Sequence, residues 1–177
     1  MSHQAWLNVA LLAVLFLASA FDIARRRIPN RLLAVGLLAA LALHLASGVP
    51  SSLLSIFLAG FAVGMIMFLP LYLMGGMAAG DVKLMATVGA FLGPSLAFQS
   101  SLATYCAGGL LALAIVLCKR RGRDAFANAG ALLHPLLLRL SGAPLAPETA
   151  PPASVGGMPY AVAISAGTML VMWFRYT

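Results

Sequence analysis

The chain has 177 residues, of which 62% are hydrophobic and only 8% charged, and its formal net charge is +7 at pH 7. A soluble domain carries about 25% charged residues, so this composition excludes an ordinary soluble enzyme and indicates an integral membrane protein. The positive net charge could indicate a nucleic-acid partner, but the positions of the basic residues follow membrane topology instead, and we expect no nucleic-acid binding.

Six apolar segments follow one another along the chain. Five of them approach the roughly 20 residues that a helix needs to cross a bilayer. The sixth, 84–92, is short for a full span and needs a thinner bilayer or extended ends to cross. In chain order the segments cover residues 5–21, 32–47, 53–74, 84–92, 96–118 and 155–174. We predict an all-α, polytopic membrane protein with about six transmembrane helices, in which residues 1–177 form a single integral-membrane domain.

The distribution of Lys and Arg predicts how these helices are oriented. One basic cluster lies at positions 25, 26, 27 and 31 and another at 119, 120, 121 and 123, and with six crossings both fall on the same side as Lys83. The opposite loops, around 47–52 and 93–98, contain no Lys or Arg. By the positive-inside rule, the loops at about 22–31, 75–82 and 119–154 are cytoplasmic and both termini are periplasmic.

The first segment ends in Ala18-Ser19-Ala20, which resembles a signal-peptidase site. No basic residue precedes the segment and a basic cluster follows it, so we expect it to be retained as a helix. Pro29 suits the first turn of a helix, so the second helix should begin at Pro29 or Asn30. Further on, Gly75-Gly76 should end the third helix, and Gly93-Pro94 should form a turn.

Gly60 and Gly64 are four residues apart in the third segment, a spacing that indicates close contact with another helix. Cys106 and Cys118 have neither metal-site nor disulfide spacing and are interpreted as packing residues. Residues 125–140 are moderately apolar and predict an interfacial or re-entrant element, and 141–154 predict a flexible loop.

Two of the four acidic residues stand at the edges of apolar segments. Asp22 closes the first segment and Asp81 precedes the fourth, whereas Asp124 and Glu148 fall in polar loops. The predicted topology places Asp22 and Asp81 at one membrane depth, and two close carboxylates in a low dielectric hold a single proton between them. The ionised member can deprotonate a water while the protonated member polarises a carbonyl, as in aspartic proteases.

Each carboxylate also has a simpler interpretation. Asp22 could form an interfacial salt bridge with the arginines that follow it, and Asp81 could be the N-cap of the helix that it precedes. Gly80 could let the backbone turn tightly beside an extended substrate, or it could merely mark a helix start. Lys83 could tune the carboxylates or orient a substrate, or it could be an interfacial anchor.

The two aspartates lie in motifs that resemble those of the type IV prepilin peptidases. The stretch FDIARRRIPN (residues 21–30) resembles the family's first motif, an Asp at a helix end followed by a basic loop and Ile-Pro-Asn. The stretch GMAAGDVKL (residues 76–84) resembles its second motif, Gly-x-Gly-Asp followed by Val-Lys-Leu. Residues 159–161, PYA, are similar to the Pro-Tyr/Phe-Gly element that often opens the last helix.

This resemblance implies a membrane-embedded aspartyl endopeptidase with Asp22 and Asp81 as its catalytic pair and with no cofactor or metal. It implies removal of short basic leaders from prepilins or pseudopilins at the cytoplasmic face of the bacterial inner membrane. The expected partners are these substrates, the lipid bilayer, and other pilus or secretion machinery. Residues expected to shape the site or bind substrate are Gly80, Ala78, Lys83, Pro29, Asn30 and Pro159.

The chain departs from the family pattern in ways that sharpen the expectation. Ala78 replaces the first Gly of Gly-x-Gly-Asp, which should make the loop less free to turn, and Ala161 replaces a usual Gly. The paired CxxC motifs of the bifunctional enzymes are absent, so the chain resembles the short, single-function members of tight-adherence (Flp-type) pilus systems. We therefore expect no methyltransferase activity.

Two other functions remain open from the sequence. A proton-coupled transporter or channel component could use the same carboxylate pair as a relay, although such carboxylates are expected near mid-membrane. A noncatalytic membrane subunit for pilus assembly could retain the fold without the reaction.

Overall fold

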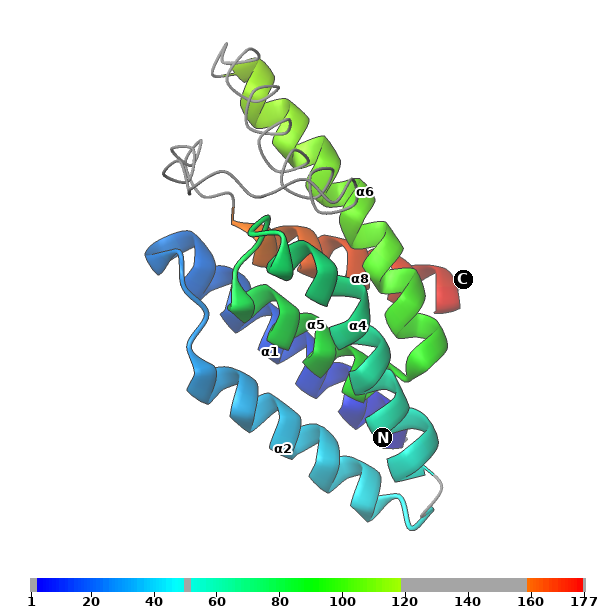
Figure 1. Cartoon of the computed structure of the whole chain (residues 1–177). Helices are drawn as coiled ribbons and strands as arrows, with labels where there is room; N and C mark the ends of the chain where they lie inside the picture. The colour runs from blue at the N-terminus through cyan, green and yellow to red at the C-terminus, as the bar shows by residue number, and fades with distance from the viewer. Residues whose placement is uncertain (1–2, 50–51, 119–158, 177) are drawn as a thin grey trace, which may run out of the picture.

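The computed structural model describes residues 3–49, 52–118 and 159–176, and the regular secondary structure within these ranges is entirely helical. In chain order the elements are α1 (His3–Arg25), α2 (Asn30–Ala46), the π-helical η1 (Leu53–Leu58), which continues into α4 (Ala59–Leu73), α5 (Ala79–Leu92), α6 (Pro94–Cys118) and α8 (Tyr160–Tyr176) (Figure 1). The expected all-α class is therefore confirmed for this part of the chain. The elements expected at 125–140 and 141–154, and residues 155–158 of the last apolar segment, lie outside the described residues.

Three of these helices are long and apolar enough to cross a membrane: His3–Arg25, Leu53–Leu73 and Pro94–Ala114. Two further apolar helices, Asn30–Ala46 and Tyr160–Arg175, are shorter. The chain is thus a helical membrane protein, and its six crossings stay a prediction.

The loop after α1 and the loop before α5 are shorter than the expected ranges 22–31 and 75–82. Helix α1 continues to Arg25, where Arg26 adopts a left-handed conformation (φ +53°) and its N–H donates to the carbonyl of Asp22 at 2.9 Å. This bond closes a last helical turn that the apolar pattern alone did not reveal. Pro29 is the N-cap of α2, so the expected start of that helix is confirmed.

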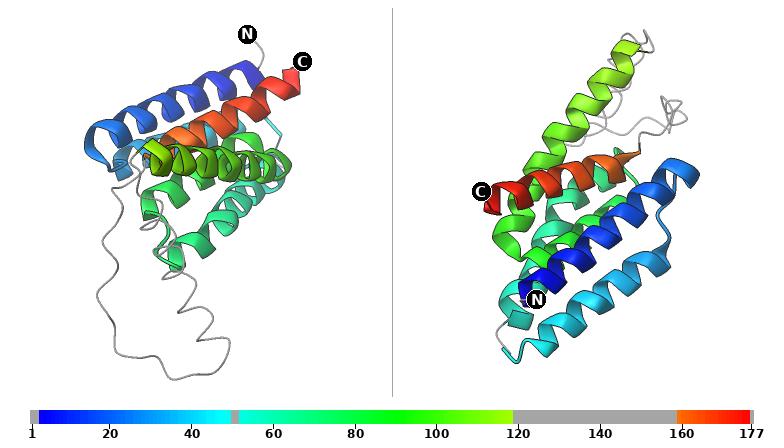
Figure 2. Two further views of the ribbon diagram at one scale, coloured as in Figure 1. Left: turned by 90° about the horizontal axis from the view of Figure 1, so that it is seen from above. Right: turned by 180° about the vertical axis from the view of Figure 1, so that it is seen from behind.

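The helices alternate in direction between two ends of the molecule. The aspartate end contains residues 22–30, 71–83, 105–112 and 159–161, most of which line one cavity. At the opposite end, α2 meets the end of α5, where His44 Nε2 lies 3.0 Å from the carbonyl oxygen of Ala90. Figure 2 shows both chain termini at this opposite end. Three helices that run toward the site, α1, α4 and α6, thus deliver residues to the same end as the beginnings of α5 and α8.

Helix α5 lies at the centre of the molecule and contacts every other helical element of the described chain. From Asp81 to Leu92 each of its residues is buried except Lys83. A helix that is surrounded by protein packs its apolar side chains against neighbouring helices, so it does not need the length of a lipid-facing span. This explains why the fourth apolar segment is short.

Helices α4 and α5 approach so closely that their backbones touch, which confirms the contact expected from Gly60 and Gly64. A Cβ atom built on Gly60 would lie 2.0 Å from the carbonyl oxygen of Gly89, and one on Gly64 would lie 2.3 Å from that of Met85. Only glycine fits at such a contact, because any side chain would meet backbone atoms that cannot rotate away.

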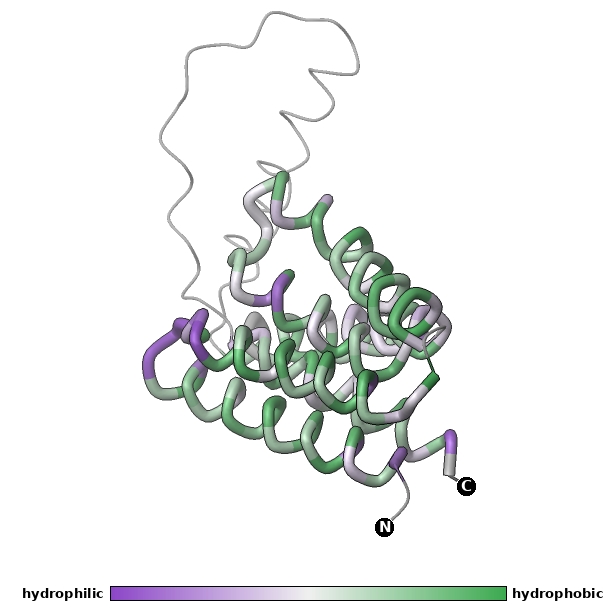
Figure 3. The backbone as a smooth tube through the Cα atoms, turned by 90° about the horizontal axis from the view of Figure 1, so that it is seen from below, coloured by the Kyte–Doolittle hydropathy of each residue, from purple (hydrophilic) through white to green (hydrophobic). Residues whose placement is uncertain are grey.

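The outer surface of the helices is strongly apolar. Large side chains point outward from several helices, including Phe16 (71% exposed), Ile66 (64%) and Trp173 (70%). Figure 3 shows hydrophobic residues along the helices and a hydrophilic segment at the turn between α1 and α2. An apolar surface of this extent is expected to face lipid.

We predict that Gly64→Ala destabilises the fold, because its new Cβ would force α4 and α5 apart. The expected loss is about 1–3 kcal/mol or more, the usual cost of overpacking. Gly109→Ala is a matched control, since a Cβ there meets nothing within 4 Å, and it should be neutral or slightly stabilising. Thermal loss of helical circular dichroism in detergent measures both, and equal unfolding temperatures would contradict the prediction.

Candidate active site

Asp22 lies in the last turns of α1 and is held by a residue far along the chain. Its side chain is 7% exposed, and its Oδ2 accepts a hydrogen bond of 3.0 Å from the backbone N–H of Ala161. Ala161 is in the first turn of α8, where backbone N–H groups have no partner within the helix. The positive end of the α8 dipole therefore points at a carboxylate. The arginines that follow Asp22 are exposed, and this backbone bond holds the carboxylate.

Asp81 lies in the first turn of α5 and is 6% exposed. The N-cap of α5 is Ala78, so the N-cap role considered for Asp81 is wrong by three positions. The Asp81 carboxylate instead accepts the N–H of Ala78 at 3.3 Å, while the N–H of Asp81 donates to the carbonyl of Ala78 at 3.1 Å. The carboxylate thus satisfies one of the free donors at its own helix start.

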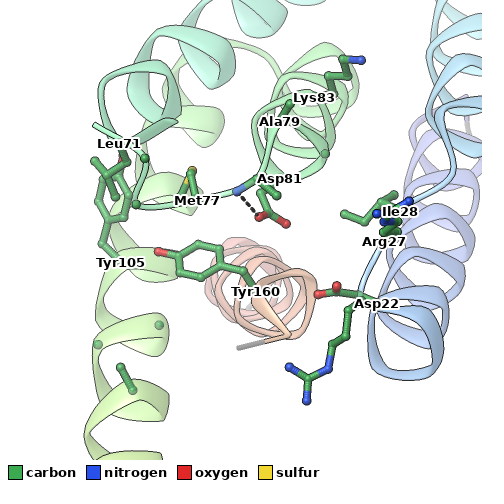
Figure 4. A pocket seen from close by; sticks show the side chains of 18 of the residues that line it. Asp22, Arg27, Ile28, Leu71, Met77, Ala79, Asp81, Lys83, Tyr105 and Tyr160 are labelled. Carbon is green, nitrogen blue, oxygen red and sulfur yellow. Dashed lines mark hydrogen bonds between the residues drawn. The ribbon is translucent and has the colours of Figure 1, made fainter. Parts of the chain in front are cut away.

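Asp22 and Asp81 line the same cavity, which has a volume of about 990 Å³. Figure 4 shows their carboxylates on opposite sides of one space, one from α1 and one from α5. The expected proximity of the two residues, which are 59 positions apart in sequence, is therefore present in the fold. Other residues of the cavity wall come from the turn between α1 and α2, from the segment before α5, and from the helices α6 and α8. They include Arg26, Arg27, Ile28, Met77, Gly109 and Tyr160.

Burial raises the pKa of Asp81 to about 6, from an ordinary value of 3.8. The neighbouring Asp22 carboxylate raises this pKa further, and the hydrogen bond from Ala78 acts in the opposite direction. Asp81 lies before the apolar run 84–92, so its carboxyl group titrates at the edge of the segment that is expected to cross the membrane and not within it. A carboxyl group with such a pKa can exchange a proton near neutral pH, as general acid–base catalysis requires.

Ala78 and Gly80 line the cavity, as expected for residues that shape the site, but neither position depends on a backbone conformation that only glycine adopts. Ala78 has an extended backbone (φ −81°, ψ 150°), a conformation open to any residue, and its side chain is exposed. The alanine therefore does not strain the loop. Gly80 is helical, and a Cβ there would make ordinary contacts of 3.4 to 3.7 Å with Ile28. The turn before α5 instead uses Gly75, whose φ of +74° favours glycine.

The other expected site residues fall in two groups. Lys83 and Asn30 line the cavity and bond to each other, with Lys83 Nζ donating to Asn30 Oδ1 at 3.1 Å. Figure 4 shows Lys83 pointing away from Asp81, so its direct effect is to tie α5 to α2. Pro29 and Pro159 lie at the starts of α2 and α8 and are not among the residues that line the cavity.

An aromatic group at the cavity was missed by sequence reasoning. The Tyr160 ring lies between the aspartates and Tyr105 (Figure 4). Phe68 stacks on Tyr105 with ring centroids 5.1 Å apart and meets Tyr160 edge-on at 6.2 Å. The hydroxyl of Tyr105 donates to the carbonyl of Met67. Tyr160 stands in the Pro-Tyr element, which was the available signal, but nothing local indicates its partners on α4 and α6.

The arrangement is suited to carboxylate chemistry at an open cavity. Two buried carboxylates share a space large enough for a peptide segment and a water, and each is held by a backbone N–H. Within the described ranges, no group of three or more His, Cys, Asp or Glu residues could hold a metal ion. The site can therefore activate water with one carboxylate and polarise a carbonyl with the other.

We predict that Asp81→Asn stabilises the folded protein at about pH 7.5. Because the pKa of Asp81 is higher in the fold, the folded state binds more protons than the unfolded chain between about pH 4 and 6, so stability falls as pH rises through that window. Above it the ionised carboxylate costs up to about 3 kcal/mol. Asparagine retains an acceptor for the Ala78 N–H without this cost.

Thermal unfolding of both proteins across this pH range tests the effect. The stability difference should be largest at about pH 7.5 and should vanish below about pH 4. A difference that stays constant with pH would contradict the prediction.

Comparison with known proteins identifies the family of the chain. Residues 9–113 match the type IV leader peptidase family. No match was found among curated proteins or among solved structures. The matched stretch covers more than half of the chain and contains both Asp22 and Asp81, and so this membrane protein belongs to the type IV leader peptidase family.

Proposed function

We propose that the protein is an aspartyl endopeptidase that removes the short basic leader of type IV, Flp-like prepilins or pseudopilins. In this proposal Asp22 and Asp81 are the catalytic pair, and one of them activates a water while the other donates to the scissile carbonyl oxygen. The observation that carries the proposal is the shared cavity of the two carboxylates, in a chain that belongs to a leader peptidase family.

The surroundings of the pair support hydrolysis rather than proton transport. Both carboxylates lie near helix termini at one end of the molecule, beside the turn 26–29, in which Arg26 and Arg27 are exposed. A relay that starts at Asp81 would need polar groups along α5, whereas α5 beyond Lys83 is apolar except for Thr87. An open cavity at the end of the helices instead admits a peptide from the membrane surface.

We predict that Asp22→Asn and Asp81→Asn each abolish cleavage of a prepilin in co-expressing membranes. Each substitution removes one half of a pair that works as a unit, so the expected loss is at least about 10³-fold. Leader removal is followed as a mobility shift of the prepilin, and membrane insertion of each variant is measured in parallel. Asp124→Asn is the matched control, since it makes the same change in a polar stretch, and it should cleave normally.

Three outcomes would overturn the proposed mechanism. Normal cleavage by either aspartate variant would show that the pair is not catalytic. Proton flux in reconstituted vesicles without any cleavage would indicate a transporter. Correct insertion with neither activity in the wild type would indicate an assembly subunit.

We also propose that the aspartate end faces the cytoplasm of a bacterial inner membrane and that both termini are periplasmic. Among the described residues, five cations lie at the aspartate end and one, Arg175, at the opposite end. The five are Arg25, Arg26, Arg27, Arg31 and Lys83. By the positive-inside rule, the end that carries more Lys and Arg residues faces the cytoplasm.

We predict that single cysteines report this orientation. In a chain whose exposed Cys106 and Cys118 are replaced by Ala, Val49→Cys should react with an impermeant maleimide added outside spheroplasts. Arg27→Cys, at an exposed position of the other end, should react only after the membrane is permeabilised. The reverse pattern would contradict the proposed orientation.

A further inference from the structure

Two serines join α1 to α8 directly behind Asp22. The hydroxyl oxygens of Ser19 and Ser165 lie 2.7 Å apart. The Ser19 hydroxyl is also 3.3 Å from the carbonyl oxygen of Ala161, and the Ser165 hydroxyl is 3.3 Å from the carbonyl oxygen of Leu15. We call Ser19 and Ser165 the serine bridge. Its two hydroxyl protons serve two of these three contacts at a time, and each contact joins residues that are 142 to 150 positions apart in the chain.

The serine bridge and the Asp22 carboxylate meet at the same residue of α8. Ala161 donates its N–H to Asp22 and receives the Ser19 hydroxyl at its carbonyl. Ser19 precedes Asp22 by three positions, so both side chains lie on one face of α1. Any movement of Ala161 relative to Ser19 therefore also changes the bond to the carboxylate.

Two buried hydroxyls of α6 bond within their own helix instead. Ser101 donates to the carbonyl of Ala97 at 2.8 Å, and Thr104 donates to that of Ser100 at 2.7 Å, each within α6. These bonds follow the common pattern in which a helical hydroxyl bonds four residues back. Ser19 and Ser165 bond across to the neighbouring helix instead, which makes them suited to fix one helix against another.

The register of α8 on α1 needs such a fixed contact. A helix rises 1.5 Å per residue, so a slip by one residue would break the 3.0 Å bond from Ala161 to Asp22. The apolar residues nearby, Leu15, Ala18 and Ile164, are buried but give no directional contact. Hydrogen bonds have defined distances and angles and therefore specify one register.

We infer that Ser19 and Ser165 are positioning residues that fix the register of α8 on α1 and thereby keep the Ala161 N–H on the Asp22 carboxylate. This inference rests on the proposed function of Asp22 in catalysis. Neither serine contacts the substrate cavity, so each acts through Ala161 and leaves peptide binding unchanged.

The test compares Ser19→Ala, Ser165→Ala and the double variant in a prepilin cleavage assay. Each single substitution should lower kcat about threefold to tenfold, the effect of losing one net hydrogen bond, without changing KM. The double variant should be no slower than the slower single variant, because both serines belong to one bridge. Ser19→Thr retains the hydroxyl and should restore most of kcat. Ser101→Ala is the matched control and should cleave like the wild type.

A second measurement gives the helix register without using activity. Spin labels at Phe16→Cys on α1 and Leu170→Cys on α8, both exposed positions, report the distance between the helices by pulsed electron resonance, with Cys106 and Cys118 replaced by Ala. The wild type and Ser101→Ala should give one narrow distance distribution. Ser19→Ala and Ser165→Ala should broaden or shift it.

These readouts separate the two proposals. If Asp22→Asn abolishes cleavage but both serine variants retain the wild-type kcat, the inference is wrong and the proposed function stands. If the wild type does not cleave, the proposed function fails, and an unchanged distance distribution in the serine variants would then overturn the positioning role independently. A rise in KM with constant kcat would also overturn it, since that result would place the serines in substrate binding.

Discussion

The backbone contact between α4 and α5 is the constraint on which the rest of the structure depends. Gly60, Gly64 and Gly89 allow the two helices to touch without side chains between them. This contact leaves room for α5 at the centre, where the remaining helical elements of the described chain can all pack against it. Because α5 is central, its first turn faces the cavity, and Asp81 reaches a position that Asp22 can share from α1.

Each carboxylate accepts a hydrogen bond from the N-terminal end of a helix. Asp81 accepts a free N–H at the start of its own helix, and Asp22 accepts one at the start of α8. Buried carboxylates are costly unless they are hydrogen-bonded, and the free N–H groups at helix starts provide such bonds from uncharged backbone. The raised pKa of Asp81 shows that its bond offsets burial only in part. The part of the burial cost that this bond does not offset keeps the pKa of Asp81 raised, so its carboxyl group can exchange a proton.

Much of this architecture could be predicted from the sequence because its signals are local. Apolar segments marked the helices, Pro29 marked the start of α2, and the spacing of Gly60 and Gly64 marked a close helix contact. The charge cost of Asp22 and Asp81 singled them out among apolar segments. Each of these signals lies within one or two helical turns, so it can be interpreted without knowing the fold.

The features that escaped prediction depend on contacts between distant segments or on backbone conformation. The bond from Ala161 to Asp22 joins residues 139 positions apart, and the partners of Tyr160 lie on other helices. The last turn of α1 depends on the left-handed conformation of Arg26, and the position of Ala78 as N-cap depends on where the chain leaves α4. The expectation that Ala78 restricts the turning of the loop was wrong for the same reason. The backbone of Ala78 is extended, and an extended backbone does not require glycine.

The dependence of Asp22 on α8 also has a consequence for biosynthesis. Both aspartates are translated within the first 81 residues, but the backbone group that holds Asp22 is at position 161. A nascent chain that has inserted α1 through α6 therefore contains both acidic groups without their complete arrangement. The site is completed only when the ribosome has made α8 and that helix has packed against α1, so assembly of the last described helix is what separates an immature chain from a finished one.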